Sequence, residues 1–217
     1  LRIVKNKAMQ WLIIFLTFLC ILPLVFILLY IIKSGISAIN WNFITNIPKP
    51  VGETGGGVAN ALLGTIIMIT VATIIAVPIG ILCGVYLSEN KKSKIASWAS
   101  ICVDILQGVP SIVIGIVAYF WIVRPAGGFS ALSGSIALAI MMFPIIIRST
   151  EETLKLLPDT LKEAALALGM PTHKVILKVI IPCGFSCIIC GVMISVARIA
   201  GETSPLLFTA FGNPYIE

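Results

Sequence analysis

The residues best able to do chemistry in this sequence are charged side chains inside long apolar stretches. Arg198 lies about 18 residues into such a stretch, counted from residue 180, and Glu202 is expected one helical turn later on the same face. A charge near the centre of a membrane-spanning helix costs about 2.5–3.5 kcal/mol, so it needs a partner or an aqueous path. Because arginine offers planar, paired donors to oxyanions, two interpretations stay open. The two side chains form a simple ion pair near the outer interface, or they line the route of an anion.

Other polar residues flank the apolar stretches. Arg148 ends the fourth stretch, where it also fits as a basic anchor on the inner side. Asp104 begins the third stretch and is expected to pair with Arg148 or to contact Gln107, one turn on. Thr203 and Ser204 are able to donate hydrogen bonds to an anion, although the same turn also reads as a plain helix end.

Other kinds of chemistry have little support. Cys183, Cys187 and Cys190 have the spacing of an iron–sulfur site, but they lie in an apolar run where cysteine behaves as a small hydrophobe. His173 is the only histidine and has no nucleophile or metal-ligand partner nearby in the sequence. No Gly-Lys dipeptide occurs, so a phosphate-binding P-loop is excluded.

The composition identifies the class of protein. Of the 217 residues, 59% are hydrophobic and only 11% are charged, against about 25% charged residues in soluble domains. So few charges cannot cover the surface of a soluble domain, and disordered chains have the opposite composition. We therefore predict an integral membrane protein.

Five long uncharged runs predict five membrane-spanning helices, because about 20 apolar residues in a helix cross a bilayer. The alternating strands of a barrel do not occur, so the predicted fold class is an all-α, polytopic membrane protein with one transmembrane domain over 1–217. The first run is too long for a cleavable signal sequence. The predicted spans are 9–32, 59–88, 98–123, 129–148 and 180–200.

The basic residues predict the orientation. With the N-terminus inside, 11 Lys and Arg residues fall in inner segments and 3 in outer segments, as the positive-inside rule requires. The basic balance thus indicates contact with anionic lipid and no nucleic-acid partner. The apolar segment 205–211 is too short to cross the membrane. We expect it to be re-entrant or interfacial, or the sequence to be a piece of a longer protein.

The inner loop 151–179 is the most informative stretch. A helix is predicted after Pro158, capped by Asp159 or Thr160 and ended by Gly169. Its small side chains would admit a partner surface, and the alternative is a helix lying in the lipid interface. The apolar face of this helix consists of Leu161, Ala164, Ala165 and Leu168.

This loop resembles the EAA loop of ABC importer permeases. The family pattern is EAA-x3-G-x9-I-x-L-P, and the sequence departs from it only by Val179 for Ile and Ile181 for Leu. Residues 197–210 (ARIAGETSPLLFTA) closely resemble a signature of phosphate ABC transporter permeases. Residues 53–61 (ETGGGVANA) resemble the segment before the second span in the PstA type of that family.

The resemblance implies a type I ABC importer permease core (MetI-like), with a sixth span usual in the family and hence a chain truncated at its C-terminus. It implies that the EAA loop docks into a groove of an ATP-binding subunit through Glu163, Ala164, Ala165 and Gly169. The predicted substrate path comprises Arg198, Glu202, Arg148, Thr203, Ser204 and Asp104.

The resemblance also implies partners: a second phosphate permease, an ATP-binding subunit dimer, an extracytoplasmic phosphate-binding protein and membrane lipid. The chain itself is expected to be no enzyme and to hold no cofactor, with ATP and magnesium bound by the partner ATPase. Its expected location is the bacterial cell membrane, N-terminus cytoplasmic. Two alternatives stay open: a permease for another oxyanion such as phosphonate, and a channel or scaffold that works without ATP.

Overall fold

A computed structural model describes residues 2–50, 52–53 and 55–212. Thr54, which belongs to the segment 53–61, lies outside the described residues, as do 213–217. The described residues form helices and no strands, which confirms the all-α class. They fall into two compact units, 1–60 and 61–217, and each is described by itself.

The first unit contains one long apolar helix. Helix α1 (Arg2–Gly35) has no buried residue, and side chains such as Phe18 are 65% exposed. A helix that is apolar all round requires an apolar environment, and α1 is long enough to cross a membrane. A 3-10 turn, η1 (Ile36–Ala38), follows α1.

A short helix, α2 (Trp41–Thr45), completes the first unit. Asn40 caps it by accepting a hydrogen bond from the backbone N–H of Phe43 at 2.8 Å. The chain then folds back on α2, where the Gly57 N–H donates to the Ile47 carbonyl at 3.1 Å. A Cβ at Gly57 would lie 2.4 Å from the Asn46 carbonyl oxygen, so only glycine permits this close approach.

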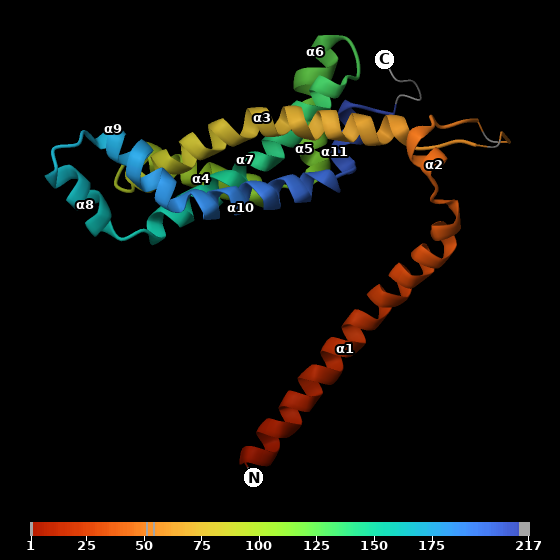
Figure 1. Ribbon diagram of the computed structural model, residues 1–217, viewed down its shortest axis with the longest axis horizontal. Helices are drawn as coiled ribbons and strands as arrows, with labels where there is room; N and C mark the ends of the chain where they lie inside the picture. Colours follow the sequence, from red (N-terminus) through yellow and green to blue (C-terminus); the bar gives the residue numbers. More distant parts are fainter. Residues whose placement is uncertain (1, 51, 54, 213–217) are drawn as a thin grey trace. The chain divides into compact units, whose positions relative to one another are not determined.

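Three long helices form the body of the second unit: α3 (Ala59–Glu89, with its first two residues at the unit boundary), α7 (Ala131–Leu156) and α10 (Ile181–Ala200). They run alongside one another in Figure 1. The central helix is α7, because 61% of its most apolar 18-residue segment is buried, against 17% of the corresponding segment of α3. The core includes Met68, Ala72 and Ala76 of α3, Leu138, Met142 and Ile146 of α7, and Ile199 of α10.

Small residues bring these helices together. A Cβ at Gly80 would lie 2.8 Å from Ile146, and one at Gly84 would lie 2.6 Å from Thr150. Between α7 and α10 the approach is closer still, because a Cβ at Gly191 would lie 1.9 Å from the Oγ of Ser149. Such contacts let backbones pack tightly, which drives helix association in membranes.

The segment predicted as a span over 98–123 contains a break. It consists of α4 (Lys94–Gly108) and a second helical stretch, Ser111–Ala126, bent by 106° from the first. The break has a local cause, because Pro110 disfavours a helical conformation in the residue before it, and Val109 is extended with ψ 128. The structure therefore has four helices long and apolar enough to span a membrane, or five if this bent pair is one span.

Two π-helical turns each end two residues before a proline. The first, η2 (Tyr119–Val123), joins α5 (Ser111–Ala118) to α6 (Arg124–Ala126), which contains Pro125. The second, η3 (Ile176–Ile180), joins α9 (Thr172–Val175) to α10, which contains Pro182. Proline lacks an N–H and its ring clashes with the preceding turn, so a locally wider turn lets each helix continue.

The apolar segment 205–211 folds back into the bundle. Most of it belongs to α11 (Ser204–Thr209), which packs against α5 and α7. Gly115 of α5 allows this contact, because a Cβ there would lie 2.7 Å from the Cα of Pro205. The Ser130 N–H, just before α7, donates to the Thr209 carbonyl at 3.2 Å. The segment is therefore packed at the α11 end of the bundle, opposite the end that carries α8 (Asp159–Ala167) and α9 (Figure 1).

Candidate functional site

The helix expected in the loop 151–179 is α8, and its last turn is closed by Gly169. Gly169 has φ +79, in the left-handed region that favours glycine. Its N–H donates to the Leu166 carbonyl at 2.9 Å, and the Met170 N–H donates to the Ala165 carbonyl at 3.4 Å. These two bonds are those of a Schellman motif. A Cβ at Gly169 would meet no atom within 4 Å, so the requirement there is backbone conformation rather than space.

The predicted N-terminal cap of this helix is wrong. Pro158 occupies the cap position, and neither Asp159 nor Thr160 supplies a capping side chain. Asp159 is instead the first helical residue, where its charge still complements the helix dipole.

The apolar face predicted for α8 divides into two sides. Ala165 is buried and packs in a cluster with Leu154, Val175 and Ile180, which holds α8 onto α7 and the α9–α10 segment. The other three residues remain exposed, with Leu168 at 83% and Leu161 at 39%. We call these three the α8 stripe: Leu161, Ala164 and Leu168.

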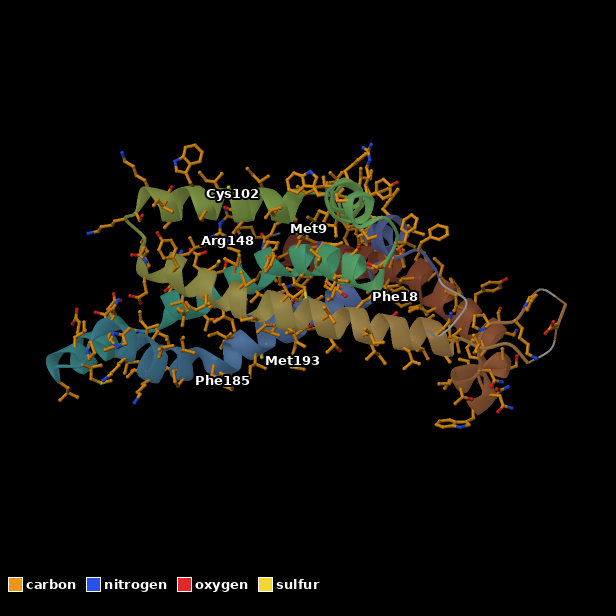
Figure 2. The ribbon with its side chains drawn as sticks, turned by 90° about the horizontal axis from the view of Figure 1, so that it is seen from above. Met9, Phe18, Cys102, Arg148, Phe185 and Met193 are labelled. Atoms are coloured by element: carbon orange, nitrogen blue, oxygen red, sulfur yellow. The ribbon has the colours of Figure 1, made fainter. Side chains whose placement is uncertain are left out.

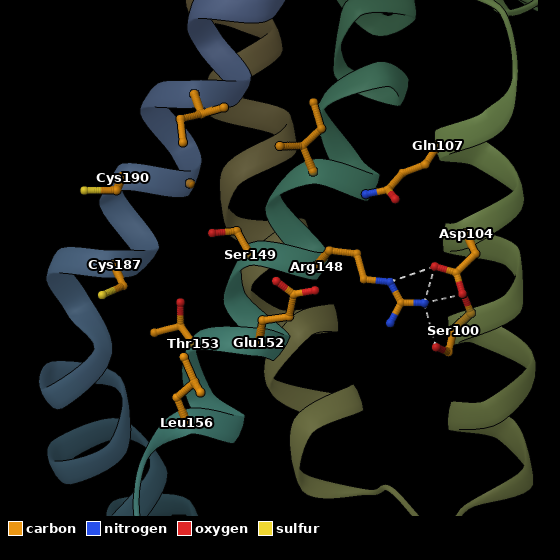
Figure 3. A pocket seen from close by; sticks show the side chains of 13 residues that line it. Ser100, Asp104, Gln107, Arg148, Ser149, Glu152, Thr153, Leu156, Cys187 and Cys190 are labelled. Atoms are coloured by element: carbon orange, nitrogen blue, oxygen red, sulfur yellow. Dashed lines mark hydrogen bonds and ion pairs between the residues drawn. The ribbon is translucent and has the colours of Figure 1, made fainter. Parts of the chain in front are cut away.

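A pocket of about 870 Å³ opens between α4, α7 and α10. Figure 3 shows α7 in the middle, with Asp104 and Ser100 on one side and Cys187 and Cys190 on the other. Two other side chains of α10, Phe185 before these cysteines and Met193 after them, are exposed at the surface (Figure 2). The pocket-lining residues with polar side chains are Ser100, Asp104, Gln107, Arg148, Ser149, Glu152, Thr153, Cys187 and Cys190.

Arg148 is the centre of an ionic network in this pocket (Figure 3). Its Nε donates to Asp104 Oδ1 at 2.9 Å, and its Nη2 pairs with the same carboxylate. Its Nη1 donates to Glu151 Oε2 at 2.6 Å. Nη2 also donates to Ser100, to the carbonyl at 3.0 Å and to Oγ at 2.8 Å. The predicted Asp104–Arg148 pair therefore exists and joins α4 to α7.

The network balances its charges. Glu151 is buried, with 3% exposure, and its second oxygen accepts from Lys155 Nζ at 2.5 Å. Two cations thus face the two carboxylates of Asp104 and Glu151, as buried charges require. Glu152 adds an unbalanced negative charge to the pocket lining. Most N–H groups of Arg148 already have acceptors, so an anion would compete with these carboxylates, and the pocket as it stands would bind an anion weakly.

Arg198 and Glu202 do not line this pocket. Their closest charged atoms, Arg198 Nε and Glu202 Oε1, lie 4.0 Å apart, beyond hydrogen-bond distance, and the Arg198 side chain is 56% exposed. Arg198 lies in the last turn of α10, where the helix dipole favours a cation.

The helical register places Arg198 on the pocket side of α10. Eleven residues separate it from Cys187, which at about 100° per residue leaves it only about 20° away around the helix. It lies about 16 Å further along the axis, toward the α11 end.

Thr203 and Ser204 lie where the chain turns from α10 into α11. Thr203 occupies the cap position of α11 and makes no side-chain capping bond, while Ser204 is the first helical residue. Both therefore lie beyond Arg198, at the α11 end and away from Arg148.

Sequence reasoning missed two partners of Arg148. The sequence analysis predicts that a loop begins at Glu151, but α7 continues through it to Leu156. The spacing from Arg148 to Glu151 and on to Lys155, three and four residues, was a usable signal for pairs on one helix face. Ser100 lies 48 residues before Arg148, and nothing in the sequence pattern indicates their contact.

The cysteines on α10 lie at its surface. Cys183, Cys187 and Cys190 are all exposed and free, and Cys102 is likewise exposed on α4 (Figure 2). Among the residues that the structure describes, no group of three His, Cys, Asp or Glu side chains is arranged to hold a metal ion.

Comparisons with known proteins agree with this architecture. Residues 76–217, more than half of the chain, match the family "binding-protein-dependent transport system inner membrane component". An inward-facing structure of the MetNI methionine ABC transporter superposes with a TM-score of 0.64, covering 71% of this chain and 75% of that one. At 21% identity, this second likeness concerns the fold alone.

Curated relatives are more similar in sequence. The phosphate transport system permease protein PstA of Pasteurella multocida is 41% identical over 216 residues, covering 99% of this chain and 76% of that protein. The PstA protein of Yersinia pestis is 42% identical over 193 residues, but the match spans only 65% of its length. The chain belongs to the family of binding-protein-dependent transport system inner membrane components and, within it, to the PstA permeases.

Proposed function

We propose that this chain is a membrane-spanning subunit of an ATP-driven importer of inorganic phosphate. The names of the PstA relatives supply the substrate. The observation that carries the proposal is that Arg148 lines an open pocket between α4, α7 and α10, and the helical register of α10 puts the exposed Arg198 on the same side, further along the helix. Two arginines so placed give an oxyanion successive partners across a membrane.

The chemistry of Arg148 suits transport better than storage. A guanidinium binds phosphate and carboxylate through the same paired donors. Phosphate oxygens would replace Asp104 as acceptors, and the carboxylate would displace them again. Competition of this kind keeps the affinity of Arg148 for phosphate low, so that a transported ion is able to leave. Glu202 would act in the same way on Arg198.

The α8 end lies in the cytoplasm in this proposal, because most basic residues lie in the segments on that side. The N-terminus is then cytoplasmic as well. The α8 stripe is the surface that docks into the ATPase subunit, with Glu163 exposed beside it and Gly169 fixing the turn that follows. Two ATPase copies bind ATP and magnesium, and this chain contributes no catalytic residue.

The remaining partners in this proposal are a second permease and a phosphate-binding protein. A second permease would close the pocket and complete the path, and a phosphate-binding protein would deliver the ion at the α11 end. Arg198, Glu202, Thr203 and Ser204 lie toward that end and would meet the ion first, whereas Arg148 and Asp104 would meet it later.

The test is reconstitution of the complete complex in proteoliposomes with the binding protein on the delivery side. We expect inorganic phosphate uptake that requires ATP on the α8 side and that excess phosphonate or sulfate does not suppress. Suppression by another oxyanion would assign a different substrate. Phosphate flux through vesicles that contain this chain alone, without ATP, would indicate a channel and contradict the proposal.

A further inference from the structure

One ion pair connects the cytoplasmic helix α8 to a helix that is distant from it in the sequence. Lys162, in the middle of α8, forms an ion pair with Glu89, the last residue of α3. The two residues are 73 positions apart. Among the described residues, this pair is the single hydrogen bond or ion pair between the side chains of α8 and α3.

The pair bridges an open cleft. A cavity of about 430 Å³ separates the α3–α4 turn from the corner between α7 and α8, and both Glu89 and Lys162 line it. The other charged residues of the lining are Lys91, Lys92, Lys155 and Asp159. Because the cleft keeps the backbones apart, the side chains of Lys162 and Glu89 make the connection, at 30% and 17% exposure.

The apolar contacts of α8 centre on α7 and the α9–α10 segment, and Ile81 and Val85 of α3 pack against the edge of the same cluster. Ala165 anchors α8 to Leu154 of α7 and to Val175 and Ile180 of the α9–α10 segment. These are the elements to which α8 is also joined through the chain. A displacement of α8 would therefore reach α7 and α10 through the buried cluster, whereas α3 receives it through the partly buried Ile81 and Val85 and through the charged contact at Glu89, its last residue.

Helix α3 is well suited to pass on such a displacement. It has 31 residues, and Gly80 and Gly84 hold it in close contact with Ile146 and Thr150 of α7. Closely packed helices move as units rather than bend continuously. A pull or push at Glu89 would therefore displace α3 together with the adjoining part of α7, which carries Arg148.

We propose that Lys162 and Glu89 are positioning residues that transmit the movement of α8 to α3. This inference rests on the proposed function of α8 as the contact for an ATPase. A partly exposed ion pair adds little to stability, so the role of the pair is to keep α8 and α3 in register. Without it, ATP-driven movement of α8 would be passed to the end of α3 less directly, through apolar contacts alone.

The experiment compares Lys162→Met, Glu89→Gln and the charge-swapped double variant E89K/K162E in the complete reconstituted complex. We expect both single variants to assemble and hydrolyse ATP, while phosphate transported per ATP falls roughly 2- to 30-fold. The double variant should restore most of the ratio, because it recreates the pair with reversed charges. Lys174→Glu is the matched control, since Lys174 lies in the same cytoplasmic loop and has no ion pair among the described residues.

A second readout separates this inference from the proposed function. Hydrogen exchange at residues 85–90 is measured with and without a non-hydrolysable ATP analogue, in complexes of the wild type and of Lys162→Met. The inference requires an ATP-dependent change in the wild type that the variant loses, whichever ion is transported. Equal changes in both, or a double variant no better than the singles, would overturn it. Absence of phosphate uptake by the wild type would overturn the proposed function alone.

Discussion

At the scale of single residues, the two arginines of the predicted substrate path differ. Arg148 is held in ion pairs, whereas Arg198 is exposed and has no close ionic partner among the described residues. Arg148 donates hydrogen bonds to Asp104, Glu151 and Ser100. Arg198 lies at 4.0 Å from its only charged neighbour among the described residues and is more than half exposed. The two arginines are therefore expected to respond differently to substitution.

Arg198→Ala is expected to lower ATP-dependent phosphate uptake about 10- to 100-fold, because hydrogen bonds to a charged group contribute roughly 1.5–3 kcal/mol. The complex should still assemble, since the side chain is exposed. Arg198→Lys is the matched control: it keeps the charge but loses the paired donors, and an intermediate rate is expected. Uptake by the alanine variant at the wild-type rate would remove Arg198 from the path.

Thr150 gives a prediction on stability. Its hydroxyl is buried and has no hydrogen-bond partner among the described residues. Thr150→Val keeps the shape and removes this cost, so the free energy of unfolding should rise by about 1 kcal/mol. Thr209 is equally buried, but its Oγ1 donates to the Pro205 carbonyl at 2.8 Å.

Thr209→Val should accordingly lower the free energy of unfolding by about 0.5–1.5 kcal/mol. Thermal unfolding of both variants in detergent, followed by circular dichroism, compares the two signs. A lower midpoint for Thr150→Val would mean that its hydroxyl has a partner after all.

At the scale of elements, the packing of α7 against α10 depends on Gly191. Gly191→Ala places a Cβ 2.4 Å from the Cβ of Ser149, so the helices must separate, at a cost of about 1–3 kcal/mol. Gly64→Ala is the control, because nothing lies within 4 Å of a Cβ there and alanine favours a helix by about 0.5–1 kcal/mol. The midpoint of thermal unfolding should fall for the first and not for the second. Equal midpoints would show that α7 and α10 adjust freely.

The elements also show how far the sequence predicts this fold. Apolar length was sufficient to find α1, α3, α7 and α10, because a bilayer imposes length directly on a helix. It does not show that the helix breaks at Pro110 within 98–123, where the bent pair still has the composition of one span. It also ended the fourth span at Arg148, although α7 continues to Leu156 because its charges pair with one another.

The site was predictable in part for similar reasons. Pairs on one helix, such as Arg148 and Glu151, follow from spacing alone, whereas Glu202 lies beyond the end of α10 and its charge is 4.0 Å from that of Arg198. Asp104 and Arg148 are 44 residues apart, and their pairing was one of two options that the sequence left open. The division of α8 into a buried Ala165 and an exposed stripe depends on which elements pack beside it, which helical spacing does not specify.

At the scale of the whole second unit, the two ends of one bundle differ in their residues, and the proposed function gives each end a different task. The α8 end holds the ion pairs Lys162–Glu89 and Lys155–Glu151 and a helix with an exposed apolar stripe. The α11 end holds Arg198 and the short helix packed against α5. Energy from an ATPase would thus enter at one end and act on an ion path that extends to the other.

Ala164 is the small residue between the two leucines of the α8 stripe. Ala164→Arg is expected to weaken docking of the ATPase subunit, because a long charged side chain prevents close contact over the small residue between Leu161 and Leu168. The bundle itself should remain intact, since Ala164 is exposed while the neighbouring Ala165 makes the internal contact. Ala164→Ser keeps the side chain small and is the matched control, with docking expected to be near that of the wild type.

The measurement is the amount of ATPase subunit that co-purifies with each variant in detergent, together with phosphate transported per ATP in proteoliposomes. Ala164→Arg should lose the subunit while retaining the thermal midpoint of the wild type, which separates a docking defect from unfolding. If it retained the subunit and the transport ratio, the ATPase would have to contact another surface of the chain. The α8 stripe would then be a face that lies in the lipid interface, the alternative that an apolar cytoplasmic helix leaves open.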